Sequence, residues 1–483
     1  MANAIDGLTP GLVWKYFAEI SRIPRGSKNE GAIGAYLVAT AKKLGLSAQQ
    51  DAVGNVLARK PASAGRESIP SVCLQGHMDM VCEKNKDTVH DFLADPIELV
   101  RDGQFIRAKG TTLGADNGIA VATCLAIMED RGLTHGPLEF LFTVDEETGL
   151  TGANNLKGGF LKSRILLNLD SEDEGELYVG CSGGRDNAGT WTAAWGKAPA
   201  GGAGRLLTVK GLRGGHSGLE IHTGRGNAIK ILTRVLIELE GLGARVARID
   251  GGNKRNAIPR EAEAVVWVPK AKTAAAAKAV KRMNELVKAE LATVEPGLVI
   301  AIQPQKDVNK VWTKGLQSNL VRALSGLPHG VLKMSADIAG LVETSTNLAI
   351  VETGKKTVSI QTSQRSSVAS EIEEASQTVR AVLELAGATA TGSDGYPGWK
   401  PDMASPVLKL AKDTYKSLYG KEPEVKAVHA GLECGIIGEK YPGMDMVSFG
   451  PTMREVHSPN EHLYIDTVGK FYDFLLGILG RIA

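Results

Sequence analysis

Five residues of this chain have side chains that bind divalent metal ions, and each follows a run that is typical of a buried β-strand. They are His77, Asp116, Glu147, Asp170 and His457, in the segments QGHMDMV (75–81), GTTLGADNG (110–118), FLFTVDEETG (140–149), ILLNLDSEDEGE (165–176) and VSFGPTMREVHSPNE (447–461). In open α/β sheets, functional groups collect beyond the carboxyl ends of the strands. We therefore expect these five side chains to meet at one edge of a sheet.

The residue types indicate a two-metal site. Neutral imidazoles and carboxylates suit zinc, and they also accept manganese or cobalt. Two histidines and three carboxylates complete two four-coordinate sites only if one carboxylate and one hydroxide bridge the ions. The charges of two dications, three carboxylates and one hydroxide then cancel, so the cluster can lie in a partly dry cleft. The residue types alone do not assign each terminal ligand to one ion.

Three positions near these ligands have further chemical roles. Asp79 lies two residues after His77, so in an extended segment both side chains share one face. It can accept the second ring N–H of His77 and fix its orientation. Glu146, next to Glu147, is free to take a proton from the bridging water and give it to a leaving amine. Asp116 stands in a glycine-rich turn before a helical pattern, a place suited to a bridge.

Several blocks of the chain, in a fixed order, resemble the M20 metallopeptidases, and in particular the branch of the aminoacyl-histidine dipeptidases (cytosol non-specific or beta-alanyl-histidine dipeptidases). The blocks are GHMDMVCEKN, AKGTTLGADNGIA, DSEDEGELYVGCSGG, GGHSGLEIHTGRGNA, NAIPREAE, YPGWKPD, HAGLECG and MDMVSFGP followed by HSPNE. The resemblance implies that Asp116 bridges two zinc ions. It implies that His77 and Asp170 complete one site and that Glu147 and His457 complete the other. It also implies Glu146 as the general base and Asp79 as the residue that orients His77.

The fold class expected from the pattern and the resemblance is α/β. The catalytic domain would be zinc-exopeptidase-like, with a mixed central sheet flanked by helices, and discontinuous, with residues 1–183 and 395–483. An inserted α+β domain, residues 184–394, would act as a lid and as a dimerisation domain. This insert is long enough for two subdomains.

The insert and its flanks contain candidate substrate-binding residues. His216 lies in a glycine-rich loop, and in relatives the corresponding histidine polarises the scissile carbonyl, so it resembles an oxyanion donor. Arg365 could hold the terminal carboxylate of a peptide by bidentate pairing. Asn256 is a second candidate for this carboxylate, and His429 and Glu433 could contact the substrate. For His216, action within its own chain and action in a partner's active site are both left open.

Composition excludes several classes of protein. A net charge of +2, without a Lys/Arg-rich tract, argues against binding to nucleic acid. No run approaches the roughly 20 apolar residues of a membrane span. The first residues predict a helix capped by Thr9, with Pro10 at its first position, and not a signal peptide. Five scattered cysteines suit a reduced, cytoplasmic environment.

These observations predict a cytoplasmic metal-dependent dipeptidase that cleaves Xaa-His and other unblocked dipeptides. A metal-bridging hydroxide would attack the carbonyl carbon, with Glu146 as general base. A homodimer through the inserted domain is compatible with this prediction. The alternatives are an N-acyl amino acid deacylase or a tripeptidase on the same metal core, and a metal-free, non-enzymatic homologue.

Overall fold

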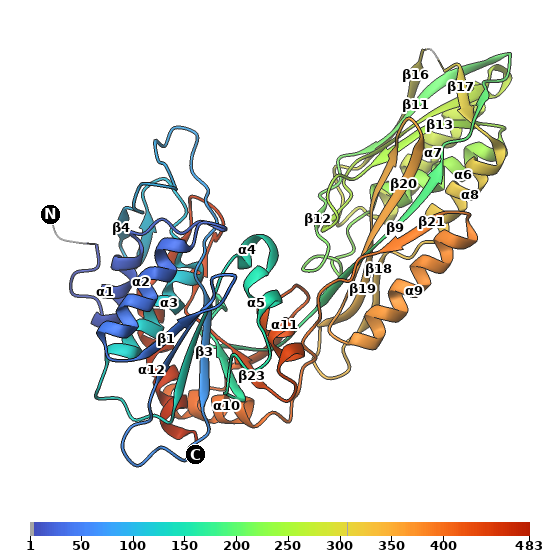
Figure 1. Ribbon diagram of the computed structural model, residues 1–483. Coiled ribbons are helices and arrows are strands. Elements are labelled where there is room, and N and C mark those ends of the chain that lie inside the picture. The colour runs from blue at the N-terminus through green and yellow to red at the C-terminus, as the bar shows by residue number, and fades with distance from the viewer. Residues whose placement is uncertain (1–3, 307) are drawn as a thin grey trace. The chain divides into compact units, whose positions relative to one another are not determined.

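Six consecutive buried residues, Val72–His77, form strand β3 at the middle of the first sheet. Its first three residues are apolar, and the whole strand is covered on both faces, as is usual for parallel strands. In the computed structural model, which describes residues 4–306 and 308–483, β3 lies between β6 (Leu138–Thr143) and β7 (Ile165–Asn168) and is parallel to both. Strand β23 (Asp445–Ser448) continues the parallel set beside β7. Figure 1 labels β3 and β23.

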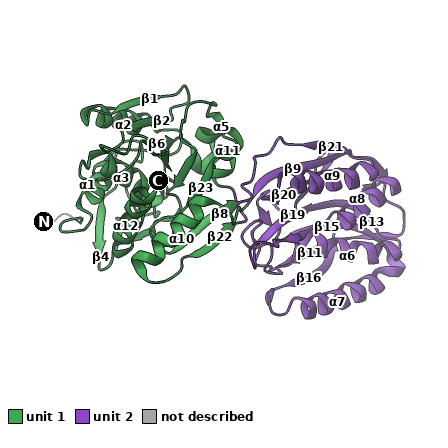
Figure 2. Ribbon diagram, turned by 90° about the horizontal axis from the view of Figure 1, so that it is seen from below, with its two compact units in different colours: residues 1–180, 401–427, 432–483 green, residues 181–400, 428–431 purple. Residues whose placement is uncertain are grey.

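The described residues form two compact units (Figure 2). Unit 1 comprises Met1–Gly180, Pro401–Ala427 and Leu432–Ala483, and unit 2 comprises Cys181–Lys400 and Val428–Gly431. The chain was predicted to divide after residues 183 and 394. Four residues of the chain around the HAGLECG block, Val428–Gly431, therefore pack with unit 2, while Glu433 of the same block belongs to unit 1.

Unit 1 contains a mixed sheet, as predicted, and this sheet has eight strands. In sheet order its strands are β1 (Ser47–Gln50), β2 (Val56–Lys60), β6 (Leu138–Thr143), β3, β7 (Ile165–Asn168), β23 (Asp445–Ser448), β8 (Glu176–Cys181) and β22 (Glu424–Val428). Strand β2 is antiparallel to β6, and β8 is antiparallel to β23, so antiparallel strands border the parallel centre. A four-stranded sheet lies beside it and consists of β24 (Met453–Arg454), β25 (His462–Tyr464), β5 (Phe105–Ala108) and β4 (Leu99–Asp102).

Helices flank the sheet of unit 1. They are α1 (Gly11–Ile20), α2 (Gly31–Lys43), α3 (Ala115–Glu129), α4 (Glu146–Gly149), α5 (Thr151–Asn155), α10 (Pro406–Tyr419), α11 (Glu433–Lys440) and α12 (Ile465–Arg481). Helix α10 begins where the sequence indicates, because the Ser405 hydroxyl accepts the N–H of Leu408 (3.0 Å) and proline occupies the first turn. Helix α1 begins later than predicted: Pro10 takes the cap position, and no side chain caps the helix.

Unit 2 is built on one nine-stranded sheet, in which every described pairing is antiparallel. In sheet order its strands are β16 (Val299–Gln305), β11 (Gly202–Lys210), β15 (Ala262–Pro269), β13 (Arg245–Gly251), β19 (Val342–Thr353), β20 (Thr357–Ser366), β9 (Gly183–Thr192) and β21 (Thr389–Gly392), and β18 (Gly330–Met334) also pairs with β19. The described contact between β13 and β19 is a single pair, Gly251 with Val351, which joins the two halves of the sheet.

Four helices share one buried core with this sheet. They are α6 (Ala228–Gly241), α7 (Thr273–Glu290), α8 (Lys314–Gly326) and α9 (Ala369–Leu385). Apolar residues of all four helices and of both halves of the sheet belong to the same buried cluster. The helices therefore cover one face of the sheet, and the two halves share one core. Among the described residues, no helix is long and apolar enough to cross a membrane.

We expect Leu74→Ala to destabilise unit 1 by about 2–5 kcal/mol, because Leu74 is fully buried in β3 and its removal leaves a cavity in the sheet. Urea unfolding followed by tryptophan fluorescence would measure the change. The matched control is Leu93→Ala, since Leu93 is 73% exposed in the same unit. Equal stability of the two variants would contradict this account of the core.

Candidate metal centre

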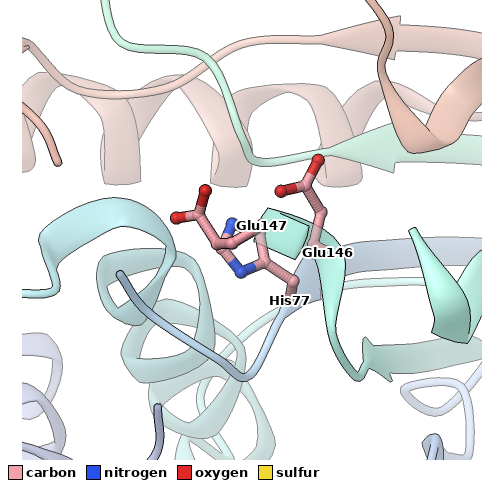
Figure 3. Close-up of side chains that lie close together, drawn as sticks. All are labelled: His77, Glu146 and Glu147. Carbon is pink, nitrogen blue, oxygen red and sulfur yellow. The ribbon is translucent and has the colours of Figure 1, made fainter. Parts of the chain in front are cut away.

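The parallel strands place three of the candidate ligands at one edge of the sheet. His77 ends β3, Glu147 lies in the turn that follows β6, and Asp170 comes two residues after β7. Because neighbouring parallel strands point the same way, their carboxyl ends lie together. Figure 3 shows Glu146 and Glu147, at the start of α4, beside the ring of His77.

The other two candidates, Asp116 and His457, do not directly follow strands of the main sheet. Asp116 lies in the first turn of α3, and the strand before it, β5, belongs to the small sheet and is only partly buried. His457 lies in the loop between β24 and β25, beyond the end of β23. The expectation that every ligand directly follows a buried strand is therefore wrong for these two residues, which loops and a helix terminus bring to the edge.

Asp116 lies between the two histidines. His77 Nε2 is 3.1 Å from Asp116 Oδ1, and His457 Nε2 is 3.1 Å from Asp116 Oδ2. On one side Asp170 Oδ1 is 3.4 Å from His77 Nε2, and on the other side Glu147 Oε2 is 3.0 Å from His457 Nε2. Two groups of potential ligand atoms result, and both contain Asp116.

The electrostatics of these residues fit a pair of cations. One carboxylate oxygen each of Glu147 and Asp170 is buried and has no hydrogen-bond partner among the described residues. Burial raises the pKa of Asp170 to about 6, and hydrogen bonds to Asp116 and Glu147 raise the pKa of His457 to about 11. The carboxylate oxygens without partners and the raised pKa of His457 both indicate an excess of negative charge among these five side chains. The donor set thus suits divalent cations, which would displace these protons.

Asp79 connects His77 to the turn that carries the two glutamates. Its carboxylate lies 3.2 Å from His77 Nδ1 and accepts the backbone N–H groups of Glu146 (3.1 Å) and Glu147 (3.3 Å). The Ser27 hydroxyl also donates to it (2.8 Å). Burial alone would raise the pKa of Asp79, but these bonds and the charge of His77 hold it at about 2, so the side chain stays ionised.

Glu146 has an environment suited to proton transfer. It lies beside Glu147 at the start of α4, and its carboxyl group lies in one cluster with His77 and Glu147. Burial and the nearby charges of Asp170, Glu433 and Glu147 raise the pKa of Glu146 well above its usual value. A carboxyl group with a raised pKa accepts a proton readily near neutral pH.

Two further carboxyl groups lie near the centre, one of them buried and the other partly buried. Glu433, expected to contact the substrate, is 1% exposed and accepts hydrogen bonds from Gln75 (2.6 Å) and Thr143 (2.7 Å) in the interior of unit 1. Burial raises the pKa of Glu433 to about 7. Glu172, which sequence analysis did not single out within its charged run, has a pKa raised to about 7 by burial and by the charges of Asp116 and Asp170.

Unit 2 gathers His216, Arg365 and His429. His216 Nδ1 accepts the backbone N–H groups of Gly218 (3.2 Å) and Leu219 (3.1 Å). The neutral ring therefore carries its proton on Nε2. Burial and the charge of Arg365 lower the pKa of His216. His216 also lines an open cavity of about 540 Å³ together with the exposed Asn256.

Arg365 and His429 are both buried and incompletely paired. Arg365 Nη1 donates to the hydroxyl of Tyr396 (3.0 Å), while its Nε has no partner among the described residues. His429 Nε2 lies 2.7 Å from the Ser345 hydroxyl, while its Nδ1 has no described partner. Burial, with the charges of Arg365 and His216, lowers the pKa of His429 to about 3. Tyr396, in the YPGWKPD block, was not expected at this cluster.

Comparison with known proteins decides the family. The model of peptidase family M20/M25/M40 matches residues 73–481. The chain belongs to this family. It is 43% identical over 481 residues to the cytosol non-specific dipeptidase of Escherichia coli (strain K12), with 99% of each chain covered. The predicted resemblance and the predicted enzyme class, a metallopeptidase that hydrolyses peptide bonds, are confirmed.

Solved structures agree with this family and with the predicted fold class. Aminoacylhistidine dipeptidase from Vibrio alginolyticus is 44% identical, with a TM-score of 0.94 over 100% of this chain and 98% of that chain. Aminopeptidase PepT from Bacillus cereus is 17% identical, with a TM-score of 0.57 over 98% and 99% of the two chains, and it shows the fold alone.

Proposed function

We propose that this M20 enzyme is a two-metal dipeptidase that cleaves Xaa-His and other unblocked dipeptides. The observation that carries the proposal is the position of Asp116 between His77 and His457, with one further carboxylate on each side. The chain is also similar over its whole length to dipeptidases from two bacteria, which supports the substrate class.

In this proposal Asp116 bridges two zinc ions. His77 and Asp170 complete one site, Glu147 and His457 complete the other, and manganese or cobalt can substitute. The ions, when bound, supply Lewis acidity and lower the pKa of water. The orphaned oxygens of Glu147 and Asp170 support this ligand set.

Glu146 is the proposed general base and acid. It takes a proton from the attacking water and later gives a proton to the departing amine. Asp79 positions His77 and holds the backbone of Glu146 at the same time, so that the ligand and the base keep their relative position.

Unit 2 supplies the proposed substrate contacts. Neutral His216, with its proton on Nε2, suits a donor to the carbonyl oxygen as that oxygen gains negative charge. Arg365, oriented by Tyr396, holds the terminal carboxylate, with His429 and Asn256 beside it. A site that binds this carboxylate favours dipeptides over longer chains. The free amine meets acidic groups near the metals, of which Glu172 is one.

Three further parts of the proposal concern the setting of the enzyme. Unit 2 acts as the lid and closes over the substrate during turnover. It also forms the interface of a homodimer. The enzyme works in the cytoplasm, and its similarity to a cytosol dipeptidase of Escherichia coli supports this part of the proposal.

We expect the purified protein to hydrolyse dipeptides and to lose this activity when a chelator removes its metal. The measurement is a panel of Xaa-His and other dipeptides, a tripeptide and an N-acetyl amino acid. Each is assayed before chelation, after chelation, and after zinc, manganese or cobalt is restored. Activity only on the acetylated substrate would favour a deacylase, and preference for the tripeptide a tripeptidase. Activity that persists after complete metal removal would contradict the metal mechanism.

We expect Glu146→Ala to retain two bound metal ions but to lose about 10²–10⁴-fold in kcat, because it removes proton transfer and no ligand. His77→Ala should lose metal as well as turnover. Metal content by mass spectrometry and kcat on one dipeptide would be measured for both variants. Glu439→Ala, at a surface position of unit 1, is the control. Equal metal loss in the Glu146 and His77 variants would refute the division of roles.

We expect Arg365→Ala to lower kcat/KM about 10- to 100-fold for a dipeptide with a free carboxylate, since a hydrogen-bonded charge contributes about 1.5–3 kcal/mol. The C-terminal amide of the same dipeptide lacks the charge and should lose much less. The ratio of the two losses is the measurement. Arg380→Ala, which removes a 48% exposed arginine on α9, is the control. A similar loss for acid and amide would show that Arg365 does not bind the carboxylate.

A further inference from the structure

The loop before α3 is held by a carboxylate that is distant in sequence. Glu461, which is 2% exposed, accepts the backbone N–H groups of four consecutive residues. Its Oε2 accepts from Leu113 (2.7 Å) and Gly114 (2.9 Å), and its Oε1 accepts from Ala115 (2.8 Å) and Asp116 (3.3 Å). The first N–H groups of a helix have no partners within the helix, and no local side chain caps α3. Glu461 therefore fills this role from the far end of the chain.

The same carboxylate also fixes the loop that carries His457. Glu461 lies four residues after His457 in the loop between β24 and β25. The side chain of His457 is 50% exposed, so packing does little to hold it. The backbone of His457 has a φ of 61°, which is in the left-handed region that non-glycine residues seldom adopt. Since Glu461 bonds directly to the N–H of Asp116, it joins the segments of two proposed ligands.

Arg25 holds the opposite side of the Asp116 loop. Its fully buried guanidinium donates to the carbonyl of Gly114, and also to the carbonyls of Met78 and Asp79 (3.0 Å each). The backbone N–H groups of this loop thus bond to the carboxylate of Glu461, and the carbonyl of Gly114 bonds to the guanidinium of Arg25. Asp79 is the residue that contacts His77, so Arg25 extends the same support to the other histidine.

We propose that Glu461 is a positioning residue of the metal centre, which sets Asp116 against His457 so that the ion between them is held tightly. The inference rests on the proposed assignment of Asp116, Glu147 and His457 as ligands. It goes beyond that assignment, because Glu461 does not reach the ions and acts only through the two segments that it joins.

The test is the stepwise metal affinity of Glu461→Gln. Glutamine has the same size, but its amide nitrogen cannot accept hydrogen bonds and must face two of the four N–H groups. Two of the four hydrogen bonds to the loop are therefore lost. Chelator-treated protein would be titrated with zinc in competition with a chromophoric chelator. We expect the affinity of one of the two ions to fall about 10- to 100-fold, the usual effect of removing a group that orients a ligand. Glu455→Gln, an exposed position of the same loop, is the matched control and should leave both affinities unchanged.

Thermal unfolding of the metal-free variants separates positioning from general stability. A purely structural role would lower the Tm of metal-free Glu461→Gln and leave the affinities of the folded protein unchanged, and this result would overturn the proposal. If Glu461→Gln does not fold, Glu461→Asp takes its place, because it keeps the charge but is one methylene shorter. Failure of both to fold would assign Glu461 to the fold and also overturn the proposal. The unsubstituted protein and Asp116→Asn, titrated in parallel, test the ligand set separately.

Discussion

The structure of unit 1 depends on a concentration of negative charge at the carboxyl edge of its parallel strands. Asp116, Glu147 and Asp170 meet there around two imidazoles, and Glu146 lies beside them. Buried like charges cannot all remain ionised without counter-charge. Without metal, protons supply part of that charge, as the pKa of about 6 for Asp170 and of about 11 for His457 indicate. Metal binding and proton release are therefore coupled at this centre.

The scaffold resists the mutual repulsion of these groups with backbone hydrogen bonds. Asn117 is an example, because its side-chain oxygen accepts the N–H of His77 (3.2 Å) and its nitrogen donates to the carbonyl of Leu169 (2.9 Å), next to Asp170. Asp79 accepts the N–H groups of the glutamate turn. Buried polar side chains that bond to backbone thus place the segments of the proposed ligands. Such hydrogen bonds fix the positions of these segments without adding another carboxylate to the cluster of Asp116, Glu147 and Asp170.

The sequence predicted the elements that carry a periodic signal. The buried runs of β3, β6, β7 and β23, each of which precedes a candidate ligand, were predicted, because the burial pattern of each strand is local and continuous. Contacts between distant segments have no such local pattern. The pairing of Glu461 with the Asp116 loop joins residues that are far apart in the chain, and nothing in either segment alone indicates it. For the same reason sequence analysis did not find Tyr396 beside Arg365, or the hydrogen bonds from Gln75 and Thr143 to Glu433.

Unit 2 contains two kinds of group that the proposal assigns to the substrate, a permanently charged guanidinium and neutral imidazoles. Arg365 carries a permanent charge, which suits a carboxylate that is charged before and after the reaction. His216 and His429 lie near this charge and are shielded from solvent, so their pKa values are lowered and both rings are neutral near neutral pH. A neutral donor binds the uncharged carbonyl of the substrate only weakly, and its hydrogen bond strengthens as the oxygen becomes negative. Under the proposed assignment, the burial that keeps His216 neutral would direct its binding energy to the transition state, while Arg365 would bind the ground state and the transition state alike.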